Sequence, residues 1–214
     1  MCLKILDYSP DLDVKDKEGK TALFCGVENR LTDVWQKILG LTPDINLTDN
    51  EGSSVLIYTI DNGLSDVFLA LLAHNPNFNI IDKEGKTPLM HAIQKESNEF
   101  CLELLKRNAD ISVVDTEGKT ALFHSIEKRL TEVVSKLLER KPEVNVRAKD
   151  GKTILLAAME KGLSDICLEL LERGVDFSTE YNGGKVPLVC AIMNGLTEVC
   201  RLWVGLLLFV VNEG

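Results

Sequence analysis

Long hydrophobic runs and positive charge are both scarce in this 214-residue sequence. The longest uncharged apolar run, residues 202–211, is about half the ~20 residues that a membrane-spanning helix needs, so we expect no membrane insertion. Lys and Arg number 24 against 33 Asp and Glu, which gives a formal net charge of −9. Such a field repels phosphate backbones, so we expect no nucleic-acid partner.

A secretory signal and paired cysteine motifs are missing as well. Asp7, Pro10, Asp11 and Asp13 interrupt the N-terminus before any apolar signal core forms, which favours a cytoplasmic location, with a nuclear one as the alternative. The six cysteines include no C-x-x-C pair, and the chain has ample apolar residues to build a core without disulfides. We expect the thiols to be reduced and mostly buried.

What the sequence does contain is a period of 33 residues. Glycines recur in register at positions 19, 52, 85, 118, 151 and 184, and leucines recur at 23, 56, 89, 122, 155 and 188. Such a period indicates one supersecondary unit that is stacked on copies of itself. We predict six units, 16–48, 49–81, 82–114, 115–147, 148–180 and 181–213, preceded at 1–15 by the second half of a unit.

Each unit reads as a turn followed by two helices. An Asp-x-x-Gly turn comes first, and a Thr or Ser that caps the first helix follows it at 21, 54, 87, 120 and 153. A second polar cap is predicted at Thr32, Ser65, Asn98, Thr131, Ser164 and Thr197, each followed by an acidic residue. A Pro or Gly then ends the second helix.

These units resemble the ankyrin repeat family. The family's T-P-L-H-x-A motif is matched by Thr87, Pro88, Leu89 and Ala92, and its closing G-A-D-h-N motif by Asp110, Asn145 and Asp176. The resemblance implies an all-α solenoid of stacked helix-turn-helix units with hairpin-like turns, elongated and curved. It also implies a non-enzymatic module that binds a partner protein on the concave face formed by the turns and the first helices. The family's His is replaced throughout by apolar residues, so packing must substitute for its hydrogen bonds.

Two rows of charge recur at fixed repeat positions. The basic row lies beside the turn and comprises Lys20, Lys86, Lys119, Lys152 and Lys185, while the acidic row near the end of the first helix comprises Glu28, Asp61, Glu127 and Glu160. In the ankyrin family both positions line the concave surface that contacts partners, so we predict partner-binding roles and expect the lysine side chains to be exposed. The plainer interpretation is a solvated face.

Catalytic, cofactor and metal sites are not predicted. Four Gly-Lys-Thr triplets imitate the end of a phosphate-binding loop, but the positions that need its first Gly hold Val14, Ile80, Val113 and Val146. His91 and His124 have no neighbouring ligand spacing for a metal, and Cys25 or Cys190 would supply only a sulfur without a base.

One rival interpretation is a passive spacer, or a fragment of a larger multidomain scaffold whose activity lies elsewhere. The variant repeats are similar to those of large endosomal scaffold proteins of the rabankyrin type. Residues 206–210 are apolar where the preceding unit has a polar loop, so we also expect missing neighbours or self-association through open repeat ends. No motif encodes the identity of the partner.

Overall fold

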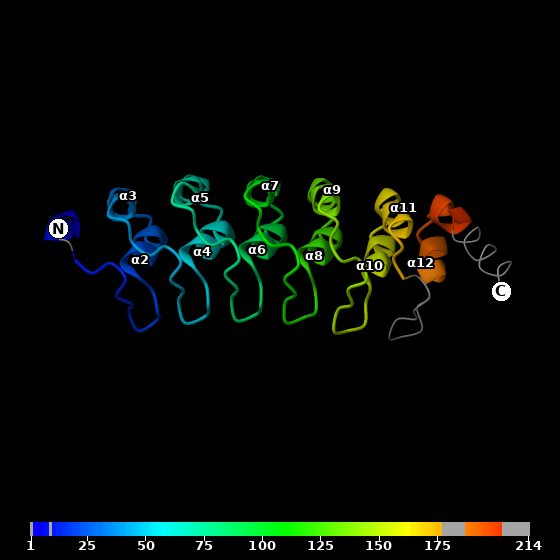
Figure 1. Ribbon diagram of the computed structural model, residues 1–214, viewed down its shortest axis with the longest axis horizontal. Helices are drawn as coiled ribbons and strands as arrows, with labels where there is room; N and C mark the ends of the chain where they lie inside the picture. Colours follow the sequence, from blue (N-terminus) through cyan, green and yellow to red (C-terminus); the bar gives the residue numbers. More distant parts are fainter. Residues whose placement is uncertain (1, 9, 177–186, 203–214) are drawn as a thin grey trace. The chain divides into compact units, whose positions relative to one another are not determined.

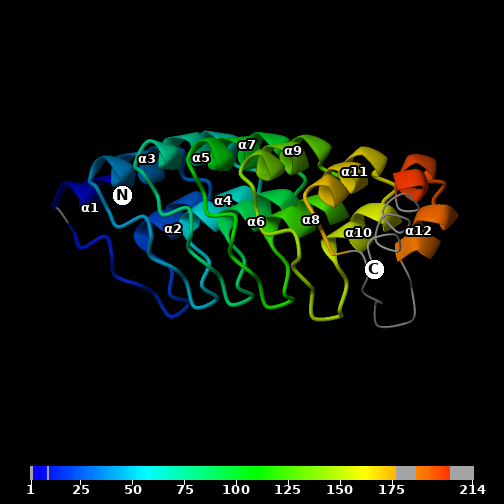
Figure 2. The ribbon, with the colours of Figure 1, turned by 45° about the vertical axis from the view of Figure 1, so that its right-hand side comes forward.

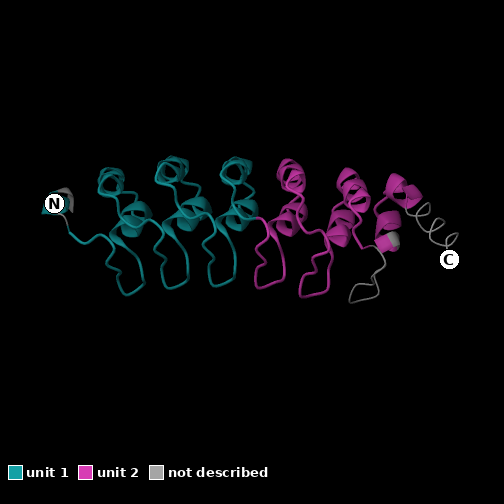
Figure 3. Cartoon of the chain, in the orientation of Figure 1, with its two compact units in different colours: residues 1–110 teal, residues 111–214 magenta. Residues whose placement is uncertain are grey.

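The computed structural model describes residues 2–8, 10–176 and 187–202, and it is built from short helices joined by long hairpin turns (Figure 1). Within these residues the β-structure consists of two isolated bridges, Thr48 with Ser54 and Arg147 with Thr153. The chain divides into two compact units, residues 1–110 and 111–214 (Figure 3). Lys185 and residues 206–210, which carry two of the predictions above, lie outside the described residues.

The first unit contains three complete helix pairs. Its described elements are α1 (Cys2–Ile5), the 3-10 turn η1 (Leu6–Tyr8), α2 (Ala22–Glu28), α3 (Thr32–Gly40), α4 (Val55–Asp61), α5 (Ser65–Leu72), α6 (Pro88–Gln94) and α7 (Asn98–Lys106). Each first helix (α2, α4, α6) packs on its second helix (α3, α5, α7), α4 packs on both α2 and α6, and α1 packs on α3. The hairpin turns lie on one side of the first helices and the second helices lie on the other (Figures 1 and 2).

The second unit repeats this arrangement. Its described elements are α8 (Ala121–Glu127), α9 (Thr131–Glu139), α10 (Ile154–Glu160), α11 (Ser164–Glu172) and α12 (Pro187–Met193), and residues 197–202 are also helical. The first helices α8, α10 and α12 pack in that order. None of the helices among the described residues is long and apolar enough to cross a membrane.

The first helices begin where the sequence predicts. The hydroxyl of each expected cap, such as Thr87, accepts a hydrogen bond from the backbone N–H three residues later, which satisfies a donor that the helix leaves open. A side-chain oxygen also closes the turn that precedes the first helix. For example, one oxygen of Asp82 accepts from the backbone N–H groups of Glu84 and Lys86, both at 2.8 Å.

The prediction for the second helices is wrong by one residue. Thr32, Ser65, Asn98, Thr131 and Ser164 are the first helical residues and not the caps. The cap position is held by Leu31, Leu64, Leu130 and Leu163, and only Ser97 makes a side-chain cap bond. The backbone explains this: the N–H of the capping residue bonds back to a carbonyl of the first helix, as from Leu31 to Gly26 at 2.9 Å, which fixes the corner without a polar side chain.

The core is apolar and continuous within each unit. The positions that hold His in the family motif carry Phe24, Ile57, Met90, Phe123 and Leu156, all at most 2% exposed. Full burial of one such side chain contributes about 1.5–3 kcal/mol. Packing therefore replaces the hydrogen bonds of the missing His, as the sequence predicts.

Neighbouring repeats are also joined through their backbones. The side chain of Asn46 accepts from the N–H of Asn77 at 2.7 Å, and the side chain of Asn79 accepts from the N–H of Asp110 at 2.9 Å. In the second unit Asn145 accepts from the N–H of Asp176 at 2.7 Å. These bonds span 31 residues and link the end of one repeat to the end of the next.

The turns approach each other closely, which accounts for the invariant glycine of the period. Gly52 has φ +79°, and a Cβ there would lie 3.0 Å from the Cα of Asp82 in the next turn. The N–H of Lys83 donates to the carbonyl of Glu51 at 3.0 Å in the same contact. Only glycine provides both the left-handed backbone and the space.

Candidate functional site

The basic and acidic rows meet within the chain, at a spacing of eight residues. In the first unit Lys20 Nζ lies 2.7 Å from Glu28 Oε1 and 2.9 Å from Glu18 Oε2. The hydrogen bonds to Glu28 and then to Glu18 raise the pKa of Lys20 above its usual value. The lysine before the helix and the acid at its end therefore form a pair across the first helix.

This pairing is interrupted in the rest of the first unit. Ser53 occupies the lysine position of the second repeat, which leaves Asp61 without that partner. In the third repeat Gln94 occupies the acidic position, and Lys86 pairs with Glu84 of its own turn instead.

The second unit contains an unbroken charge network. Lys119 Nζ lies 2.9 Å from Glu127 Oε2, and the other oxygen of Glu127 lies 3.7 Å from Lys152 Nζ. Lys152 Nζ also lies 2.6 Å from Glu160 Oε2. Burial lowers the pKa of Lys152, but the hydrogen bond and charge of Glu160 outweigh it, so that the pKa is raised. We call Lys119, Glu127, Lys152 and Glu160 the charge network.

The expected exposure of the lysines is wrong. The side chains of Lys20, Lys86, Lys119 and Lys152 are only 15–19% exposed, while those of Glu28, Asp61, Glu127 and Glu160 are 24–33% exposed. The cause is packing of the lysine stems, because the ammonium groups of Lys20 and Lys119 lie 5.6 and 5.5 Å from the ring centres of Phe24 and Phe123. The acids are the more accessible row.

His91 takes the place of the missing lysine opposite Asp61. Its Nδ1 lies 3.1 Å from Asp61 Oδ1 in the preceding repeat, and its Nε2 lies 2.9 Å from Asp82 Oδ2 in its own turn. Burial lowers the pKa of His91, but Asp61 and then Asp82 outweigh that effect, so the pKa is raised. The sequence suggested only a metal-ligand role for this residue, and its spacing did not predict this clamp between two carboxylates.

His124 occupies the same repeat position with the opposite electrostatics. Its Nε2 lies 2.7 Å from Asp115 Oδ2. Burial and the charge of Lys119 lower the pKa of His124 more than the bond to Asp115 raises it. Two equivalent histidines therefore favour different protonation states.

Exposed apolar side chains on the turns were not singled out from the sequence. Val14 and Ile81 in the first unit are 62% and 52% exposed, and Val114 in the second unit is 50% exposed. Ile81 and Val114 each stand immediately before the Asp of a turn. An apolar residue at that otherwise polar position is the signal that could have identified them.

The described residues include no cluster of three His, Cys, Asp or Glu side chains that could hold a metal ion. Of the cysteines whose side chains are described, Cys101, Cys167 and Cys190 are buried, and Cys25 and Cys200 are half-buried. Burial raises the pKa of Cys101 and of Cys167 to about 12, which suppresses the reactive thiolate.

Comparison with known proteins agrees with this architecture. A family model for ankyrin repeats matches three overlapping segments, residues 27–115, 56–150 and 98–181. No curated protein sequence matches the chain. A solved structure, the ankyrin repeat domain of Bcl-3, described as a unique member of the IkappaB protein family, is similar to it with a TM-score of 0.74 and 23% identity, over 94% of this chain and 90% of that one. On the strength of the family match and the repeated helix pairs, the chain belongs to the ankyrin repeat family.

Proposed function

We propose that this chain is a non-enzymatic module that binds a partner protein through the surface of its turns and first helices. Ankyrin repeats are generally protein–protein interaction modules and are typically not enzymes. The observation that carries the proposal is the exposure of Val14, Ile81 and Val114 on turns that lie next to the paired lysine and acidic side chains. Apolar side chains with a polar surround are the composition of protein interfaces.

The paired charges orient a partner more than they add affinity. Lys119 and Lys152 are already held by the acids of the charge network, so little side-chain entropy remains to be lost on binding. The more exposed acids of both units are accessible to basic groups of a partner. Such rim charges act mainly on the rate of encounter, and salt screens them over about 8 Å at physiological ionic strength.

Site-specific photo-crosslinking tests which surface is used. A photoreactive amino acid is placed at Ile81, on a turn, or at Leu69, on α5, because these two side chains are 52% and 53% exposed in the same unit. We expect discrete crosslinked partners from position 81 and none of the same mass from position 69. The same broad, non-specific labelling from both positions, or none from position 81, would support the passive spacer.

A charge exchange tests the charge network without breaking it. The variant K119E/E127K/K152E/E160K reverses every charge but keeps each opposite-sign contact, so we expect its thermal unfolding to stay close to that of the parent. A photoreactive amino acid at Val114, the exposed turn residue of the second unit, would capture partners of that unit. These partners should associate more slowly with the charge-exchanged variant. An unchanged association rate would mean that these charges form only a solvated face that no partner contacts.

We further propose a cytoplasmic or nuclear location, in keeping with the acidic composition and the buried thiols. A larger scaffold of the rabankyrin type remains the alternative setting for the same module.

A further inference from the structure

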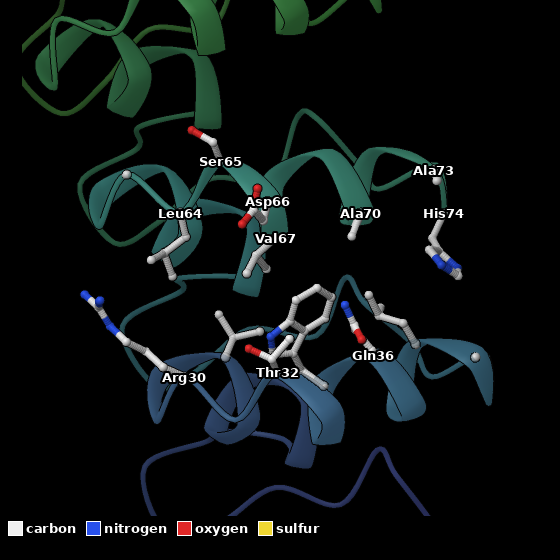
Figure 4. A pocket seen from close by; sticks show the side chains of 15 residues that line it. Arg30, Thr32, Gln36, Leu64, Ser65, Asp66, Val67, Ala70, Ala73 and His74 are labelled. Atoms are coloured by element: carbon white, nitrogen blue, oxygen red, sulfur yellow. The ribbon is translucent and has the colours of Figure 1, made fainter.

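A groove of about 900 Å³ lies between α3 and α5 in the first unit, on the second helices and away from the turns. Leu39, Val67, Ala70 and Trp35 contribute its apolar lining. Figure 4 shows Arg30 and His74 toward opposite ends, with Gln36 on one wall and Asp66 on the other.

The groove exists because α5 departs from the repeat at two positions. Ala70 and Ala73 occupy the places that hold Glu103 and Lys106 in α7, where the two side chains form an ion pair at 2.8 Å. In the second unit the same two places of α9 hold Lys136 and Glu139, again paired at 2.8 Å. Long paired side chains therefore cover the helix surface in these other repeats, and two methyl groups leave it open in α5.

The polar groups around the groove are not used by the chain itself. Within the part of the chain that the structure describes, the side chains of Arg30, Gln36, Asp66 and His74 make no hydrogen bond or ion pair, and the indole N–H of Trp35 has no acceptor although this residue is only 6% exposed. A buried indole N–H normally finds an acceptor. The guanidinium of Arg30 is exposed at the end of the groove and makes no ion pair within the described residues, so it is accessible to a ligand.

The size and chemistry of the groove select its occupant. Helix α5 has eight residues and is about 12 Å long, which matches about four residues of extended chain. Trp35 and Gln36 offer a donor and a mixed donor and acceptor to a peptide backbone, and the apolar lining suits alternate side chains. Arg30 suits one carboxylate at its end, while Asp66 disfavours a second one beyond it.

We propose that this groove binds a short extended peptide of a partner protein, with one acidic residue paired with Arg30 and apolar side chains against Trp35, Leu39 and Val67. A second copy of the chain is disfavoured as the occupant, because two molecules of net charge −9 repel each other. The site is separate from the turn surface, so the two proposals succeed or fail independently.

The test uses a hexapeptide library in which one position is Glu and two alternate positions are Val, Ile, Leu or Phe, with a matched library that has Lys in place of Glu. Selected peptides are titrated against the W203F variant, in which Trp35 is the remaining tryptophan and reports occupancy by its fluorescence. We expect saturable binding, with Glu peptides preferred over their Lys counterparts by about tenfold, the effect of one charge-assisted bond.

Two variants copy solutions that the chain already uses elsewhere. A70E/A73K restores the ion pair of α7 and should abolish binding while the fold is kept. R30G replaces a residue with φ +55° by the glycine found at the equivalent positions 63 and 162, which also have positive φ, and should remove the preference for Glu over Lys.

Several outcomes would overturn the proposal. They are a library without any enriched peptide, equal binding to A70E/A73K, or a charge preference that survives in R30G. A dimer in sedimentation that A70E/A73K dissociates would identify a second copy as the occupant instead.

Discussion

Substitution of His91 by Gln should destabilise the first unit most in acid, because the imidazolium is clamped between two carboxylates. The raised pKa means that folding favours the protonated form. The stabilisation is therefore complete below the unfolded value of about 6.5 and is lost as the pH rises through the higher folded pKa. Gln keeps a hydrogen-bonding side chain but cannot carry the charge.

The geometry sets the size of the effect. Two charge-assisted hydrogen bonds at 2.9 and 3.1 Å contribute about 1.5 kcal/mol each. Burial of the imidazole opposes its charge, and the side chain of Asp61 is 30% exposed, so the total is at most about 2 kcal/mol at pH 5.5. A single titrating group limits the decline to about 1.4 kcal/mol per pH unit, so the difference should shrink as the pH rises from the unfolded pKa through the raised folded pKa.

Urea unfolding of H91Q in the W203F background measures this, since Trp35 reports on the same unit. The matched control is H124Q, followed by circular dichroism. The lowered pKa of His124 means that the parent loses stability as the pH falls from about 6.5 toward the folded pKa, and H124Q should remove that loss. A destabilisation by H91Q that is independent of pH, or one that grows toward pH 9, would refute the clamp.

Three further outcomes are expected. Gly52→Ala should cost at least ~1 kcal/mol more than Gly63→Ala in chemical denaturation, because both glycines have positive φ but only the first has a close neighbour across its missing Cβ. Glu127→Gln should lower the thermal stability of the second unit by the equivalent of about 0.5–1 kcal/mol at low salt and by less at 1 M salt, since it weakens two contacts of the charge network. The half-buried thiol of Cys25, whose pKa is raised first by burial and then by the charge of Asp16, should react slowly with a disulfide reagent in the native protein, whereas that of Cys101 should react only on unfolding.

Each of these outcomes has a clear contrary result. Equal costs at positions 52 and 63 would mean that the turns relax apart. An effect of Glu127→Gln that is unchanged by salt would point to packing and not to charge. Rapid labelling of Cys101 under native conditions would show that the second helices open locally.

The fold was predictable because the same turn, cap and leucine positions recur from repeat to repeat. The Asp-x-x-Gly turn and the Thr cap are local chemistry, so Asp82 and Thr87 form the predicted bonds. The period also indicated that the Leu positions are buried, and Leu89 and Leu122 are. The second-helix caps could not be predicted in the same way, because a backbone bond to the first helix takes the place of the side-chain cap that the polar residues indicate.

The site was less predictable, because it depends on what neighbouring repeats bring together. The two charge rows were visible, but not that Lys119 and Glu127 neutralise each other. His91 contacts Asp61, 30 positions earlier, and Asp82, 9 positions earlier. This clamp arises where the repeat has Ser53 in place of a lysine. The positions that depart from the period decide which side chains pair. Their pairing can be predicted only when the neighbouring residues in three dimensions are known.

The 31-residue spacing of the Asn–backbone bonds has a mechanical consequence. Asn46 and Asn79 each tie one repeat only to the next, so no bond of this series carries tension past its immediate neighbour. Under a pulling force the repeats of the first unit should therefore unfold one after another. Each step would free about 33 residues, or roughly 110 Å of extended chain. A molecule built this way can lengthen under load by shedding its outermost repeat and still keep the folded surface of the repeats that remain.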